Sequence, residues 1–204
     1  MGLAIEVMAV DWHRLEAIPA GERVDRLYEE TCEVEGVEEG WSWPPSDGHP
    51  WWGIYEFRNT LGSYKPHFWA GEAWDDAREH AEPELRDALD GFLAGLGIWL
   101  WGPEEDDDED DEGEGSPDAD ADADAWRSGL LLCRPPADIS ALAALWSRAE
   151  PLLDGLREPF DAHAARGPGR WIPDHAAFAS LLRGWGEVIG EADRRGWGVV
   201  GLKC

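Results

Sequence analysis

Apolar residues are distributed along the chain in two patterns, the first of which predicts strands at both ends. Leu3–Val10 is an almost unbroken apolar run bounded by Gly2 and Asp11, as is typical of a buried strand. Trp197–Leu202 is a second run of this kind at the other end. Both runs are too short for a buried helix, so we expect both to lie in one central sheet.

The second pattern is helical spacing of apolar residues, which predicts several helices between the two end strands. A short helical turn is expected over 12–18, and longer helices are expected over 22–34, 83–96, 139–156 and 174–195. Asp11, Asp138 and Asp174 are placed to cap three of them, and Pro151 should interrupt the helix over 139–156.

Glycine, proline and tryptophan positions refine these helices. Gly97 and Gly196 are expected helix ends. A short strand is expected at 54–57, and Pro66 and Gly71 are expected to interrupt regular secondary structure after it. Two tryptophans, Trp146 and Trp185, fall on apolar helix stripes, and we expect both to be buried. Three glycines weaken the last helix or let another backbone approach it closely: Gly184, Gly186 and Gly190.

These elements predict the fold class α/β (or α+β), in a single compact domain. We expect a small mixed sheet that includes both chain termini and is packed by several helices. The length of 204 residues suits one domain with a sizeable core. Residues 1–102 and 126–204 would together form this domain, interrupted by 103–125.

The interruption at 103–125 carries fourteen carboxylates and no basic residue. Like charges at this density repel one another and leave almost no apolar surface to bury, so we expect a long disordered acidic insertion. Short apolar runs flank it at 98–101 and 130–133, and these are expected to pair as strands. Removing the insertion should leave the fold intact.

Charge defines the class of partner. The net charge is −27, and without the fourteen carboxylates of the insertion 30 acidic residues still face 17 basic ones, a balance of −13. Such a field disfavours nucleic-acid phosphates and anionic membranes and favours a basic protein partner. We therefore expect no nucleic-acid or membrane binding, and we assume a monomer.

Compartment and cofactors follow from what the sequence lacks. Three cysteines, Cys32, Cys133 and Cys204, form neither a disulfide framework nor a zinc motif, and Cys133 is expected to be a small core residue. The start of the chain resembles no secretion signal, and no apolar run approaches membrane-spanning length. We expect a cytoplasmic protein without cofactors, and the abundance of Ala, Gly, Arg, Asp and Trp indicates a GC-rich bacterial genome.

Catalytic and metal-binding motifs are absent from the sequence. Six histidines form no HExxH motif or metal-ligand spacing, and Asp161-x-His163 is the nearest approach to an Asp/His pair. Ser116 lies between glycines and proline without the preceding strand that a nucleophile elbow requires. We expect neither catalytic nor metal-ligating residues.

The best candidate binding site is a loop rich in tryptophan and proline. Aromatic faces beside polar side chains suit protein recognition or stacking on a ligand. The candidate residues are Trp41, Trp43, Asp47, His49, Trp51, Trp52 and Trp69. The alternative is that this loop packs over the core as a lid.

Both chain ends resemble the uncharacterised bacterial YfbM-like family. Met1-Gly2, an apolar strand, Val10-Asp11 and Leu15 are similar to that family's opening, and the ending Arg195-Gly196-Trp197-Gly198-Val199-Val200 is similar to its close. The matches cover about a quarter of the chain, and the family's central motif of an aromatic, Leu-His and a turn ending in Thr-Gly is absent. The resemblance implies a compact α/β domain and favours an immunity-type inhibitor.

Three functions remain open from the sequence. The first is a non-enzymatic acidic binding protein, of immunity or inhibitor type, that recognises a basic protein. The second is a ligand-binding protein or hydrolase that uses the loop at 41–52 with Asp47, His49, Glu56, Glu72 or Asp75. The third is a protein without a ligand whose charge serves only solubility. The second requires those polar side chains to converge in one pocket.

Overall fold

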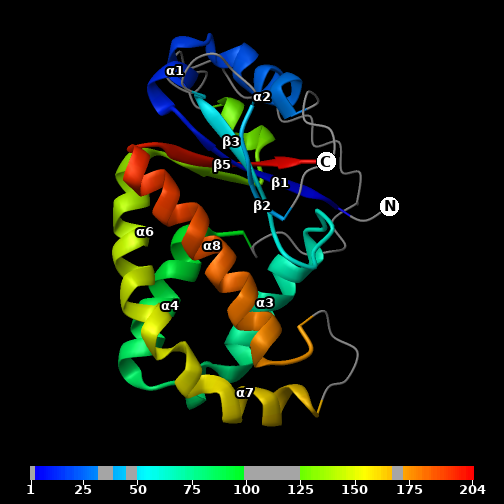
Figure 1. The fold of residues 1–204 in the computed structure, drawn as a ribbon, viewed down its shortest axis with the longest axis vertical. Helices are drawn as coiled ribbons and strands as arrows, with labels where there is room; N and C mark the ends of the chain where they lie inside the picture. The colour runs from blue at the N-terminus through cyan, green and yellow to red at the C-terminus, as the bar shows by residue number, and fades with distance from the viewer. Residues whose placement is uncertain (1–2, 32–38, 45–49, 99–124, 167–171) are drawn as a thin grey trace, which may run out of the picture.

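The computed structural model describes residues 3–31, 39–44, 50–98, 125–166 and 172–204 (Figure 1). Within these ranges the strands form one five-stranded sheet with β1 at its centre, in the order β2-β3-β1-β5-β4. The strands are β1 (Ile5–Val10), β2 (Gly40–Ser42), β3 (Trp52–Glu56), β4 (Leu132–Arg134) and β5 (Gly198–Lys203).

Helices cover both faces of the sheet, which gives three layers (Figure 1). One face carries α1 (Trp12–Ala17), the 3₁₀ helix η1 (Ala20–Glu22), α2 (Arg23–Thr31) and the 3₁₀ helix η3 (Ala125–Gly129). The other side holds α3 (Lys65–Ala77), η2 (Arg78–His80), α4 (Pro83–Leu96), α6 (Pro136–Ala149), η4 (Glu150–Leu156), α7 (Arg157–Ala164) and α8 (His175–Arg195). The sheet therefore separates two apolar cores.

The predicted α/β fold with both chain ends in the sheet is confirmed. β1 and β5 pair along their whole length, from Ile5 opposite Lys203 to Val10 opposite Gly198. The prediction of a mixed sheet is wrong, because every strand pair described is antiparallel. A parallel strand pair needs a crossover, usually a single helix, that carries the chain back along the sheet. Between β4 and β5 the chain instead runs out along α6 and returns along α8, so β5 begins at the end of the sheet where β4 finished.

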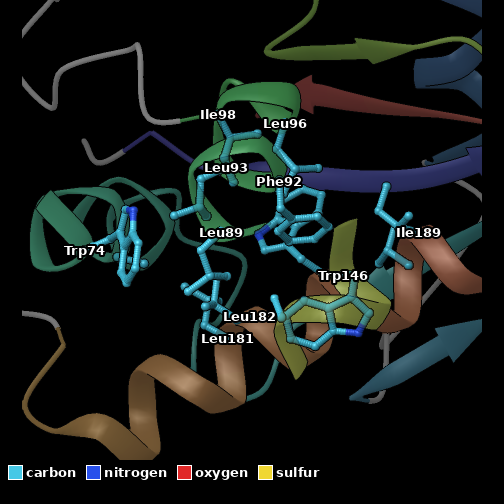
Figure 2. Packing of buried hydrophobic residues seen from close by; sticks show 14 of the residues in the cluster. Trp74, Leu89, Phe92, Leu93, Leu96, Ile98, Trp146, Leu181, Leu182 and Ile189 are labelled. Carbon is cyan, nitrogen blue, oxygen red and sulfur yellow. The ribbon is translucent and has the colours of Figure 1, made fainter. Parts of the chain in front are cut away.

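The larger core lies between the sheet and the helices α3, α4, α6 and α8 (Figure 2). Trp146 and Trp185 are buried in it as predicted, and the ring of Phe92 lies 5.3 Å from that of Trp146. A Cβ atom at Gly186 would lie 2.1 Å from the Trp146 indole, and one at Gly190 would meet open space. Gly186 thus admits an aromatic ring, not another backbone.

Most predicted helix boundaries are confirmed. The carboxylates of Asp11 and Asp174 accept hydrogen bonds from the backbone N–H groups of Arg14 and Ala177, so both cap helices. Left-handed glycines follow α4 and α8, with φ of 67° at Gly97 and at Gly196. Pro151 divides α6 from α7 by placing a 3₁₀ helix between them.

Two boundary predictions are wrong. Asp138 lies inside the first turn of α6, because Pro136 already occupies the first helical position, where its missing N–H costs nothing. α3 runs through both Pro66 and Gly71. Pro66 again lies in a first turn, and Gly71 is buried where packing outweighs its low helix propensity.

Several predictions concern residues outside the described ranges. The acidic insertion at 103–125, with Ser116 and the division of the domain around it, lies there except for Ala125 at its edge. Of the expected strand at 98–101 only Ile98 is described, and it is buried. β4 pairs with β5. Its pairing with 98–101 stays a prediction, because residues 99–101 lie outside the described ranges.

Candidate functional site

The structure divides the predicted aromatic site among three places. Trp41 and Trp43 lie together at the β2 edge of the sheet. Trp51 and Trp52 pack into the smaller core on the opposite face, and Trp69 lies half-buried in α3. Asp47 and His49 fall outside the described residues. The seven residues therefore do not form one site in the part of the chain that is described.

Trp41 and Trp43 belong to a half-buried cluster that we call the indole stack: Trp41, Trp43, Arg195 and Trp197. The rings of Trp41 and Trp43 stack 4.9 Å apart at an interplanar angle of 17°. The Arg195 guanidinium lies 4.0 Å from the Trp43 ring and 4.8 Å from that of Trp197. Trp43 rests on β3, since a Cβ atom at Gly53 would lie 2.3 Å from its ring.

The charges of the indole stack are satisfied within the chain. Arg195 Nε donates to Glu191 Oε1 at 2.6 Å, and Arg194 donates to both oxygens of the same carboxylate. The hydrogen bond from Arg194, followed by that from Arg195, lowers the pKa of Glu191. An arginine of the chain itself thus occupies the cation position on the indoles.

Trp52 has a structural role on the other face. It is almost fully buried, and its Nε1 donates to Glu30 Oε2 at 2.7 Å. Arg26 Nη2 lies 2.5 Å from the other oxygen of Glu30, so a buried carboxylate joins the indole to a cation. Trp52 has no surface to offer to a ligand, as the lid alternative had predicted for this loop.

At the other end of the β2–β3 pair the surface is hollowed. The hollow has a volume of about 420 Å³, and we call it the acidic hollow. It is lined by Glu39, Glu56, Phe57, Asn59, Leu61 and Gly62. Its walls therefore combine two carboxylates with apolar surface.

Leu61 stands on the turn that forms one wall of the acidic hollow. Its side chain is 96% exposed, the one large apolar side chain so exposed in the described ranges. Leu61 also adopts a left-handed backbone with φ of 52°, next to Gly62 at 71° and close to Asn59 at 59°. Left-handed backbone geometry is energetically unfavourable for a bulky L-residue such as leucine, and the cost is smaller for Asn and Gly.

Hydrogen bonds fix this turn to the sheet. Gly62 N donates to Glu56 Oε1 at 3.0 Å, and Gly62 O accepts from Ile5 N of β1 at 2.9 Å. Thr60, beside Leu61, is buried, and its hydroxyl donates to Phe57 O at 3.0 Å. The exposed leucine is consequently held between a buried threonine and a glycine that is hydrogen-bonded to the sheet.

Among the residues that the structure describes, the acidic hollow has no closely held cation. Burial raises the pKa of Glu56, and the nearby charges of Glu6 and Glu39 raise it further, against hydrogen bonds from Gly62 and Thr60 that lower it. Arg58 Nε lies 3.8 Å from Glu39 Oε2, but its side chain is 73% exposed. The buried Oε2 atom of Glu6 has no hydrogen-bond partner among the described residues.

The polar residues required by the hydrolase alternative do not converge where they are described. Glu56 lines the acidic hollow, Asp75 lines a separate hollow of about 180 Å³ between α3 and α4, and Glu72 is exposed on α3. In that second hollow Asp90 already accepts from Trp74 Nε1 and pairs with Arg78. In the described ranges no three His, Cys, Asp or Glu side chains are grouped as metal ligands.

Three of the described histidines, His67, His163 and His175, make structural contacts. His163 pairs with Asp76 of α3 at 3.0 Å, not with Asp161, which accepts from the backbone of His175. His67 is buried, and its Nδ1 accepts from Trp185 Nε1 at 3.1 Å. Its proton therefore resides on Nε2, which has no partner in the described part of the chain. Burial lowers the pKa of His67 to about 3.

Sequence reasoning missed the acidic hollow and Leu61. The available signal was the segment 58–62, Arg-Asn-Thr-Leu-Gly, where an apolar residue stands inside a turn-forming sequence between a strand and a helix. The register that places Glu39 beside Glu56 comes from the pairing of Gly40 with Glu56 in β2 and β3, which no local pattern reveals.

Comparison of this chain with protein-family models, curated proteins and solved structures found no match. The resemblance to the YfbM-like family therefore stays a prediction. None of the described helices is long and apolar enough to cross a membrane.

Proposed function

We propose that this protein is a non-enzymatic acidic binding protein that recognises a basic protein partner. The observation that carries the proposal is the acidic hollow, where carboxylates without a close counter-ion lie beside an exposed leucine. Such a surface has unfavourable self-energy in the free protein, which a cationic partner would relieve.

The rest of the chain supports the same class of partner. A net charge of −27 attracts basic proteins over long distances and raises their association rate. The indole stack lies beside this surface along β2. Its cation position is already occupied by Arg195 of the chain itself, so we do not expect a partner cation to bind there. The narrower role, an immunity or inhibitor protein in a bacterial cytoplasm, rests on the resemblance and on composition.

The proposal is tested by capture followed by measurement with purified proteins. The full chain is immobilised and exposed to an extract of its host at low and high salt. Basic proteins retained only at low salt are then produced in recombinant form and titrated against the chain by calorimetry. We expect a saturable complex whose affinity falls steeply with salt. The absence of any basic protein that binds saturably would overturn the proposal.

A further inference from the structure

We propose that the acidic hollow is a socket for an arginine side chain of the partner, with Leu61 and Phe57 lining its stem and Glu39 and Glu56 binding its guanidinium. This inference rests on the proposed function and deepens it, since it names the contact. It commits to one occupant, an arginine presented by a basic protein.

The shape and lining of the hollow suit that side chain. Arginine carries a three-carbon stem that packs on apolar surface while its planar head stays with charged groups. The hollow offers both surfaces side by side, with Phe57 and Leu61 on its walls next to the two carboxylates. A volume of about 420 Å³ accommodates a side chain of this size together with water.

Charge complementarity selects a cation over a neutral or anionic group. Glu56 accepts from Gly62 N through Oε1, which fixes its carboxylate. Burial is the main cause that raises the pKa of Glu56, and the nearby negative charges of Glu6 and Glu39 add to it. A guanidinium would offset one of these three negative charges and lower their mutual repulsion, and its forked donors match a carboxylate in two hydrogen bonds.

Arg58 is the intramolecular competitor. Its guanidinium reaches Glu39 only at 3.8 Å and remains largely in water, so a partner arginine displaces a weak contact. The indole stack shows the opposite case, where Arg195 is held at 2.6 Å by Glu191 and is not replaceable at low cost. Of these two places, the hollow is therefore the one where a partner cation would replace a weak contact.

The test uses N-acetyl-Gly-Arg-Gly-amide as a defined probe, with the Gln peptide as its neutral counterpart. Methyl and amide NMR spectra of the full chain are recorded during titration with each peptide. We expect saturable shifts centred on Leu61 and Gly62, with a dissociation constant in the millimolar range typical of one side chain. The Gln peptide should produce no saturable shifts.

Four variants assign the contacts. Glu39→Gln and Glu56→Gln should each weaken the Arg peptide about three- to tenfold, the loss of one partly exposed charged hydrogen bond. Glu56→Gln keeps an oxygen to accept from Gly62, so the turn is retained. Leu61→Asn should weaken it by a similar factor, and Arg58→Gln should strengthen it about twofold by removing the competitor.

Glu158→Gln is the matched control, since Glu158 is an exposed carboxylate on α7, at the far end of the molecule from the sheet (Figure 1). It removes the same charge and should leave binding unchanged. The inference is overturned by equal shifts from both peptides, by shifts centred elsewhere, or by a Glu158→Gln effect as large as that of Glu56→Gln. A captured basic protein that binds Glu56→Gln and Leu61→Asn as tightly as the wild-type chain would also overturn it while leaving the proposed function in place.

Discussion

The two ends of the β2–β3 pair differ in how their apolar and charged side chains are satisfied. At the indole stack, Trp43 lies against Gly53 and the guanidinium of Arg195, and Glu191 balances that arginine. At the acidic hollow, Leu61 is exposed on an unfavourable backbone, and the nearest cation described is Arg58, 3.8 Å from Glu39. Groups satisfied within the chain contribute to stability, and the groups left unsatisfied here are the ones that we propose a partner contacts.

The largest expected effect tests the core beneath the hollow, where Phe57 contacts His67. The pKa of His67 is lowered by burial to about 3 from an ordinary 6.5. Above pH 6.5 both folded and unfolded chains are neutral there, so the stability is complete. Below 6.5 the unfolded chain alone binds the proton, and stability falls by about 1.4 kcal/mol per pH unit until about pH 3.

Urea unfolding from pH 7.5 to 4 measures this loss in the wild type and in His67→Gln. Glutamine can still accept from Trp185 but does not titrate in this range. We expect the difference between the two free energies of unfolding to shrink or reverse as pH falls, since the carboxylates titrate alike in both. A constant difference would mean that His67 is not neutral and buried.

The next effect is expected at the indole stack. Trp43→Ala removes a ring packed between Trp41 and Arg195 and should lower the free energy of unfolding by about 2–3 kcal/mol, below a full core tryptophan because the ring is half-buried. Binding of the Arg peptide by the remaining folded protein should not change. A variant of normal stability with lost binding would transfer the binding site to the stack.

Two glycines of α8, the helix that supports both ends, give a matched pair. A Cβ at Gly186 would lie 2.1 Å from the Trp146 ring, so Gly186→Ala should cost about 1–3 kcal/mol by forcing that ring to move. Gly190 faces open space, so Gly190→Ala should gain about 0.5–1 kcal/mol from helix propensity. Thermal melts of both variants check the pair, and equal effects would contradict the packing described.

The smallest effect is expected at Leu61. Leu61→Asn should stabilise the protein by about 0.5–1 kcal/mol, because Asn tolerates the left-handed backbone better than leucine. Leu61→Val should lose a similar amount, since a β-branched residue is least compatible with that backbone. Chemical denaturation resolves the two signs. A stabilising Leu61→Asn that binds less would show that this leucine serves binding at the expense of stability.

Much of the fold followed from the sequence, since its signals are local. Apolar runs located β1 and β5, helical stripes located α4, α6 and α8, and the caps at Asp174 and Gly196 marked helix ends within one residue. The candidate site was predicted less well. The five proposed residues that are described fell into three places, with Trp41 and Trp43 stacked at the β2 edge, because clustering of tryptophans in sequence does not specify the face of the sheet on which each one lies.

The sequence by itself determined the periodicity of the elements, the caps that bound them and the net charge on which the proposal of a basic partner rests. These properties act over a few residues or over the whole chain, and both scales can be read without coordinates. The tertiary structure alone decided the antiparallel pairing, the aromatic ring against Gly186 and the placement of Glu39 and Glu56 beside Leu61. Each of these depends on contacts between segments distant in sequence or on the backbone geometry of a turn, which packing and strand register fix after the local elements have formed.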